Sequence, residues 1–193
     1  MTRLRHHRVA LFALLILTVA ACSSSPPALY TIAPVQGQAQ TGAPPVVVVQ
    51  TVGLARYLDR SQIVRSSEAS RLDVQTNDWW GEPLGAMLTR VLAEELTQRL
   101  PQSTVINEAG AVTASPDAVI EIDVRRLDED GGGNLILLAQ ANVNFKSRKS
   151  SVLRNFRIVV PPPGTGTPGQ VAAISAAVGQ LADGLAAILA AGR

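Results

Sequence analysis

Two stretches in which apolar and polar residues alternate flank a short glycine-rich segment, and this pattern restricts the fold more than any other part of the sequence. Residues 120–124 and 137–145 both alternate, as strands with one buried face and one solvated face do. Between them lie three acidic residues, Asp128, Glu129 and Asp130, followed by three glycines and Asn134. Such a composition favours a tight turn, so we predict an antiparallel hairpin.

Further strands are predicted on both sides of this hairpin. Residues 46–51 form a β-branched run that suits a strand buried on both faces. Residues 62–66 and 71–75 are predicted to form a second hairpin around the polar segment 67–70. Residues 104–106 and 153–160 are the remaining predicted strands.

Two segments show helical periodicity. The first extends from Pro83 to Leu100 and is stopped by Pro101. The second begins at about Pro168, with Thr167 as its N-cap, and its second face consists mostly of alanine and glycine. The predicted buried stripes are Leu84, Met87, Leu88, Val91, Leu92, Leu96 and Leu100 in the first helix, and Val171, Ile174, Val178, Leu181, Leu185 and Ile188 in the second.

These elements predict a single α+β domain in which two helices pack on one face of an antiparallel sheet. On the first helix, Glu95 and Arg99 lie four residues apart on the side opposite the apolar stripe, where such a pair contributes only a few tenths of a kcal/mol. On the opposite sheet face, the outward residues include Arg125, Gln140, Asn142 and Asn144. They form either a solvated surface or a subunit contact, and the sequence leaves both open.

The N-terminus has the parts of an export signal in order. Arg3, Arg5 and Arg8 precede an apolar segment of 11 residues, 9–19, whereas a membrane-spanning helix needs about 20 apolar residues. The order Val-Ala-Ala-Cys that ends at Cys22 matches the bacterial lipobox. We expect a signal peptide over residues 1–21, a lipidated N-terminus and flexible tether over 22–45, and the folded α+β domain over 46–193.

Cys22 is the predicted lipidation site and the first residue of the mature chain. The alternative is an incidental or buried thiol behind an ordinary cleavage site. The preceding small residues, the lack of a second cysteine and the following Ser- and Pro-rich segment favour lipidation, and two or three acyl chains anchor a protein stably. The residue after Cys22 is Ser23 and not the aspartate that typically retains lipoproteins in the inner membrane. In this respect the chain resembles lipoproteins that are sorted to the outer membrane. This resemblance implies a lipid anchor at the periplasmic face of the outer membrane of a Gram-negative bacterium.

Composition excludes several classes of function. His6 and His7 lie in the signal peptide and Cys22 is the single cysteine, so the mature chain has no ordinary soft-metal ligand set, and we predict no metal and no cofactor. Removal of three arginines with the signal leaves 14 basic and 15 acidic side chains, a net charge of −1, which argues against nucleic-acid binding. For the acidic turn at Asp128, a solvated turn is favoured over a calcium site, because the ligand spacing of an EF-hand is missing.

Four blocks of the sequence carry a family resemblance. They are the lipobox cysteine, the segment 29–32, the segment 52–64 with its run Leu-Ala-Arg-Tyr-Leu-Asp-Arg, and the run Trp-Gly-Glu-Pro-Leu at 80–84 that leads into residues 91–96. Together they resemble the ABC-type transport auxiliary lipoproteins over essentially the whole mature chain. The glycine-rich turn and the alanine-rich last helix are not diagnostic.

The resemblance implies a non-enzymatic role in envelope lipid traffic. The protein would be an outer-membrane-anchored docking subunit of an MCE/ABC-type intermembrane lipid transport system. Its partners would be the membrane, through acyl chains on Cys22, an MCE-domain periplasmic conduit protein, and further copies of itself in a homo-oligomer. The expected partner-binding residues are Arg56, Tyr57, Asp59, Arg60, Trp79 and Trp80.

Other interpretations remain open from the sequence. A structural or assembly lipoprotein of another envelope complex would share the lipobox and the tether. An envelope hydrolase would have to work with Asp, Glu, Ser, Lys or Tyr alone. For Trp79 and Trp80, packing in the core or at the helix entrance is the alternative to a partner or lipid contact.

Overall fold

The structure, a computed structural model, describes residues 25–147 and 150–192, and one long strand organises its sheet. This strand, β7 (Ala118–Glu129), pairs along its length with the antiparallel strand β8 (Leu135–Phe145). Strand β9 (Ser150–Val160) pairs antiparallel with β8. In the turn between β7 and β8, Gly133 has a φ of 79°, a conformation that favours glycine. The hairpin predicted around the glycine-rich segment is therefore confirmed.

The other edge of β7 is covered by three short strands that follow one another in the chain. They are β2 (Val46–Val49), β3 (Gly53–Leu54) and β4 (Gln62–Ser66), and each pairs with β7 in parallel. Strand β6 (Thr104–Asn107) pairs in parallel with β2. The segment 46–66 thus runs beside β7 as one interrupted strand.

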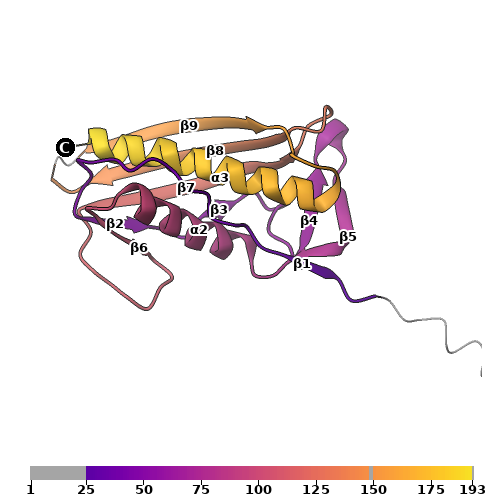
Figure 1. The fold of residues 1–193 in the computed structure, drawn as a ribbon, viewed down its shortest axis with the longest axis horizontal. Coiled ribbons are helices and arrows are strands. Elements are labelled where there is room, and N and C mark those ends of the chain that lie inside the picture. Colours follow the sequence, from indigo (N-terminus) through magenta and orange to yellow (C-terminus); the bar gives the residue numbers. More distant parts are fainter. Residues whose placement is uncertain (1–24, 148–149, 193) are drawn as a thin grey trace, which may run out of the picture.

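A small outer part of the sheet lies at the end of β7 (Figure 1). Strand β4 turns through the 3-10 turn η2 (Glu68–Ser70) into the antiparallel strand β5 (Asp73–Trp80), as the predicted second hairpin requires. Strand β1 (Ala28–Tyr30) then pairs in parallel with β5. The described chain therefore joins the sheet at this end, close to its N-terminus.

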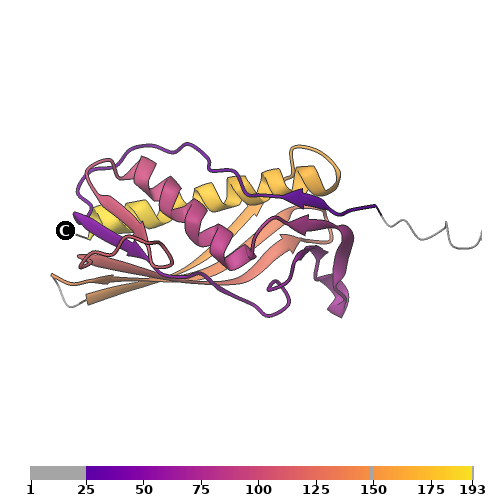
Figure 2. The ribbon, with the colours of Figure 1, turned by 90° about the horizontal axis from the view of Figure 1, so that it is seen from below.

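Two helices of the described chain cover one face of the sheet (Figure 2). Helix α2 (Leu84–Arg99) and helix α3 (Gly166–Ala191) pack against each other, and every residue of the two predicted stripes is buried. Helix α3 is long and apolar enough to cross a membrane by length and composition alone, but 67% of its most apolar stretch is buried inside the fold. It is therefore built into the core.

The α+β class with both helices on one face is confirmed, and two details differ from the prediction. The sheet is mixed, because β2, β3 and β4 run in the same direction as β7 and β1 runs in the same direction as β5. Helix α3 begins at Gly166, after the N-cap residue Thr165. Thr167, predicted as the cap, lies inside the first turn, where its hydroxyl donates a hydrogen bond to the carboxylate of Asp78.

The tether expected over residues 22–45 is the main departure from the sequence prediction. The signal peptide and Cys22 lie outside the described residues, but the chain from Ala28 onward is packed on the domain. We call residues 31–45 the N-terminal strap, and Figure 2 shows it crossing the outer side of the two helices. Ile32 is buried, its N–H donates to Met87 Sδ at 3.2 Å, and the N–H of Ala33 donates to Ser175 Oγ at 3.2 Å.

Arg99 lies beneath this strap and not on the surface where its spacing from Glu95 had placed it. Its side chain is only 1% exposed. Nε donates to Asp183 Oδ1 at 2.6 Å, Nη2 donates to the carbonyl of Gly179 at 3.1 Å, and Nη1 donates to the carbonyls of Val35 and Glu95 at 3.1 and 3.2 Å. One guanidinium group thus joins α2, α3 and the strap.

The strap approaches the guanidinium group so closely that it needs a glycine. A Cβ on Gly37 would lie 2.3 Å from the central guanidinium carbon of Arg99, a distance that no substitution tolerates without movement. Three residues after Gly37, the N–H of Gln40 donates to the backbone carbonyl of Arg99 at 2.7 Å. The strap therefore follows the end of α2 closely on both sides of Gly37.

Glu95, on the same helix as Arg99, also holds the strap, and we call these two side chains the clamp. Its Oε1 accepts the N–H of Val35 at 2.8 Å, while Oε2 is buried without a hydrogen-bond partner. Burial raises the pKa of Glu95 to about 7, and the opposing effects of the Val35 N–H and of Arg99 only partly offset it, with Asp183 and Glu94 adding to the increase. The backbone of Val35 is thus held at both its N–H and its carbonyl by side chains of α2.

The first prediction concerns Arg99. Arg99→Met leaves the buried carbonyls of Val35 and Gly179 without donors, and we expect the free energy of unfolding to fall by about 3 kcal/mol. Urea denaturation followed by circular dichroism measures the change. The control is Arg90→Met on the same helix, which removes an exposed pair with Glu82 and should cost less than about 1 kcal/mol. Equal losses in the two variants would contradict the role given to Arg99.

The second prediction concerns pH. Because the folded pKa of Glu95 is raised above its ordinary value, its ionisation opposes folding, so the contribution of Glu95 to stability is fully present below about pH 4.5 and is lost as the pH rises through 7. Glu95→Gln removes this titration. The difference in the free energy of unfolding between variant and wild type should shift in favour of the variant by about 2 kcal/mol when the pH is raised from about 5 to about 8. Urea unfolding at both pH values measures this shift. Glu94→Gln, the exposed neighbour, should show no such shift, and a shift equal to that of Glu95→Gln would refute the assignment.

Candidate functional site

The two most distinctive blocks of the sequence meet at one hollow on the surface. The hollow has a volume of about 460 Å³ and is lined by Asp59, Arg60, Ser61 and the segment from Trp80 to Leu84. The first three residues belong to the loop 55–61 between β3 and β4, and the others connect β5 to α2. Two segments about twenty positions apart in the chain therefore form a single site.

Backbone hydrogen bonds and one buried leucine fix the loop 55–61. The N–H of Ala55 donates to the carbonyl of Val124 in β7 at 2.9 Å, and the N–H of Leu58 donates back to Ala55 at 2.9 Å. The side chain of Leu58 lies in the core. This attachment to the central strand leaves Asp59 and Arg60 exposed beside the hollow.

Tyr57 anchors the same loop through its hydroxyl. Tyr57 Oη donates to Asp128 Oδ2 at 2.6 Å, and Asp128, which is fully buried, also accepts a hydrogen bond from Arg126 Nε at 2.8 Å. Burial and the neighbouring Asp128 carboxylate raise the pKa of Tyr57 far above its usual range, so the phenol stays a neutral donor. Tyr57, expected to bind a partner, directs its polar group into the fold.

The opposite wall of the hollow is equally well fixed. The N–H of Trp80 donates to the carbonyl of Ser61 at 2.7 Å, which ties the two blocks together directly. The N–H of Gly81 donates to the carbonyl of Tyr30 at 2.8 Å. Glu82 Oε1 accepts from Arg90 Nη2 at 2.6 Å. The wall therefore joins β1, β5 and α2 at one point.

The lining of the hollow combines apolar and charged side chains. Pro83 is the exposed apolar residue of the lining, because Trp80 and Leu84 lie in the core with 7% and 3% of their surface exposed, while Asp59, Arg60 and Glu82 supply charges of both signs. A small apolar area within a charged and polar rim is typical of protein–protein contact sites. The arrangement therefore suits a segment of another polypeptide.

The six residues predicted to bind a partner are only partly brought together. Asp59, Arg60 and Trp80 line the hollow, and Arg56 is exposed on the same loop. Trp79 lies on the other face of β5, because successive strand residues alternate. Glu82, which lines the hollow, was missed as a single residue although it lies inside the Trp-Gly-Glu-Pro-Leu block. The strap residues were missed because their composition resembles a linker.

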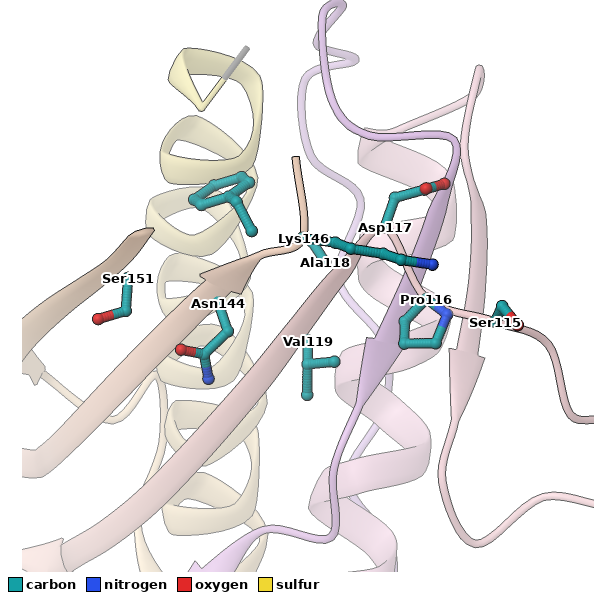
Figure 3. Close-up of a pocket in the computed structure, with 9 residues that line it drawn as sticks. Ser115, Pro116, Asp117, Ala118, Val119, Asn144, Lys146 and Ser151 are labelled. Atoms are coloured by element: carbon teal, nitrogen blue, oxygen red, sulfur yellow. The ribbon is translucent and has the colours of Figure 1, made fainter. Parts of the chain in front are cut away.

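A second hollow of about 470 Å³ lies at the far end of the sheet (Figure 3). Asp117, Asn144 and Lys146 contribute polar groups, and Figure 3 shows the Lys146 side chain extending towards Pro116. The Asp117 carboxylate already accepts the N–H of Val46 at 3.1 Å, so it holds the fold together. The hollow contains none of the predicted binding residues and is not our candidate.

The open face of the sheet carries the polar residues expected there. Asn142 Nδ2 donates to Glu121 at 2.9 Å, and Gln140 Nε2 donates to Asn155 at 3.0 Å. In the acidic turn, Asp130 Oδ1 accepts the N–H groups of Gly132 and Asn134 at 2.9 Å each, and these bonds lower the pKa of Asp130. Within the described ranges, no group of three or more His, Cys, Asp or Glu residues is arranged to hold a metal ion.

Comparison with known proteins agrees with this fold. A family model described as "ABC-type transport auxiliary lipoprotein component" matches residues 29–186. A comparison with curated proteins gave no match.

Two solved structures share the fold. One, described only as an uncharacterized protein, is 16% identical with a TM-score of 0.71, and the alignment covers 84% of this chain and 98% of that one. The other, protein XCC0632 from Xanthomonas campestris, a DUF330 protein, is 20% identical with a TM-score of 0.69 over 87% of this chain and 97% of that one. The PelC dodecamer from Paraburkholderia phytofirmans is more distant, with 10% identity and a TM-score of 0.41 over 78% of this chain and 95% of that one.

The third prediction concerns the hydroxyl that anchors the loop of the candidate site. Tyr57→Phe removes one partner of the buried Asp128 carboxylate, and we expect the free energy of unfolding to fall by about 1–3 kcal/mol. Urea denaturation measures the loss, and faster amide hydrogen exchange in the loop 55–61 would accompany it. Asp59→Asn on the exposed side of the loop is the control and should change stability by less than about 0.5 kcal/mol. An unchanged stability in Tyr57→Phe would show that the hydroxyl does not anchor the loop.

Proposed function

The chain belongs to the family of ABC-type transport auxiliary lipoprotein components, and on this basis we propose that it is the docking subunit of an intermembrane lipid transport system. In this proposal, acyl chains on Cys22 anchor the protein to the periplasmic face of the outer membrane. The folded domain binds the end of an MCE-domain conduit that crosses the periplasm. The homo-oligomer implied by the sequence resemblance stays a prediction.

The convergence of the two sequence blocks at one hollow carries the proposal. A docking subunit needs a rigid contact surface, and the hydrogen bond from Trp80 N–H to the Ser61 carbonyl fixes the relative position of the two walls. Charges of both signs, from Arg60 on one wall and Glu82 on the other, favour a specific orientation of a polypeptide partner. These features support binding of the conduit through the exposed residues Asp59 and Arg60, with Arg56 on the same loop, while Trp80 lies in the core and supports the wall behind them.

The role assigns no chemical step to the protein. The family is defined as a component of transport systems, and the groups around the hollow are those of a contact surface. Asp59 and Glu82 are the carboxylates at this hollow, and Glu82 is paired with Arg90 at 2.6 Å. We therefore expect the protein to act by holding its partner at the membrane.

The fourth prediction tests the docking surface in cells. A photoreactive amino acid placed at Arg60 should crosslink the lipidated protein to an MCE-domain protein, which mass spectrometry identifies. The same amino acid at Ser115, on the rim of the far hollow, is the matched control and should give no such product. Recovery of the conduit from Ser115 and not from Arg60 would move the docking site away from the candidate hollow.

The anchor and the partner are tested separately in the same experiment. Cys22→Ala should release the protein from the outer-membrane fraction, because the acyl chains are the proposed attachment. Retention of the variant in that fraction would overturn the lipid anchor. Crosslinks from Arg60 only to unrelated outer-membrane machinery would overturn the transport role in favour of a structural or assembly lipoprotein.

A further inference from the structure

An exposed leucine and a half-buried tryptophan lie together at the end of the domain where the N-terminal chain enters. Leu29 of β1 is 68% exposed, and the residue paired with it on β5 is Trp79. Partners in a parallel ladder place their side chains on the same face of the sheet, so the leucine and the half-buried indole lie side by side. The next pair, Tyr30 and Trp80, lies on the opposite face, where Trp80 is buried in the core.

The hydrogen bonding of Trp79 leaves its ring available. Trp79 Nε1 donates to the carbonyl of Thr76 at 2.9 Å within the same strand, so the polar group of the indole is satisfied locally. Because its N–H is satisfied inside the protein, the indole adds only apolar area to that of the exposed leucine, and aromatic rings are enriched at the boundary between lipid headgroups and acyl chains. The pair is separate from the hollow lined by Trp80.

The length of chain between the anchor and this pair limits where the pair can be. Leu29 follows Cys22 by only seven residues, and a fully extended chain of that length spans at most about 25 Å. Pro26 and Pro27 lie within it and restrict its conformations. Helix α3 alone has 26 residues, a length of about 39 Å. The β1 end therefore stays near the anchor, while the far end of the domain can extend away from it.

We propose that Leu29 and Trp79 form a membrane-contact surface that inserts at the headgroup level of the phospholipid leaflet holding Cys22. The inference rests on the proposed lipid anchor. It assigns Trp79 to lipid and leaves the hollow at Trp80 and Arg60 to the protein partner. The acyl chains hold the protein at the membrane, and the Leu29–Trp79 contact sets which end of the domain faces it.

The fifth prediction uses the full-length acylated protein in vesicles of phosphatidylethanolamine and phosphatidylglycerol whose acyl chains carry bromine near the headgroup. Bromine quenches tryptophan fluorescence only at short range. The wild type should lose fluorescence relative to unbrominated vesicles of the same lipids. Trp79→Phe, which retains the buried Trp80, should lose this quenching.

Matched surface variants keep the test independent of folding. Leu29→Ser should reduce the quenching of Trp79, because the exposed side chain contributes to insertion and not to the core. Val112→Ser is the control, since Val112 is 67% exposed and lies in the loop between β6 and β7 at the other end of the sheet (Figure 1). It should leave quenching unchanged.

The outcomes separate this inference from the lipid anchor. Mass spectrometry that finds no acyl chain on Cys22 would overturn both. An acylated, vesicle-bound wild type without bromine quenching, or a Trp79→Phe variant quenched like the wild type, would overturn the membrane-contact surface and leave the anchor in place. Such a result would assign the Leu29–Trp79 pair to a protein partner.

Discussion

The structure depends on a cationic group buried where three segments meet. The guanidinium of Arg99 donates to an acidic side chain on α3, to a backbone carbonyl of the same helix, to one carbonyl of its own helix and to one of the strap. A buried arginine is costly unless its donors are satisfied, and here the donors are divided among α2, α3 and the strap. The strap, which has few apolar residues of its own, is thereby held across both helices.

Much of the fold follows from patterns that need no tertiary information. The hairpin of β7 and β8, the second hairpin of β4 and β5, and the buried stripes of α2 and α3 result from periods of two and of 3.6 residues, and all are present. The mixed strand directions of the sheet, in contrast, do not follow from local periodicity. Pairing of β2, β3 and β4 with β7 joins segments distant in the chain, and alternation within a strand says nothing about the direction of its neighbour.

The candidate site shows a similar division. Sequence blocks indicated which residues matter, but not that Tyr57 turns its hydroxyl inward to Asp128 while Asp59 and Arg60 stay outside. The strap could not be predicted, because its Pro, Gly, Gln and Ala content is that of a linker. Its order comes from side chains of the helices, chiefly Glu95 and Arg99, whose spacing is equally typical of a surface ion pair.

The strap also has a mechanical consequence, since it lies in series between Cys22 and the rest of the domain. A pull on the domain would load the β1–β5 ladder along the strand direction, so that its hydrogen bonds resist in shear together and do not open one at a time. Behind β1, the Arg99 and Glu95 clamp on Val35 forms a second point of resistance. Should both yield, residues 28–45 would add about 60 Å of extended chain between Cys22 and the rest of the domain. The same segment would then lengthen under load and so limit the force that reaches the domain.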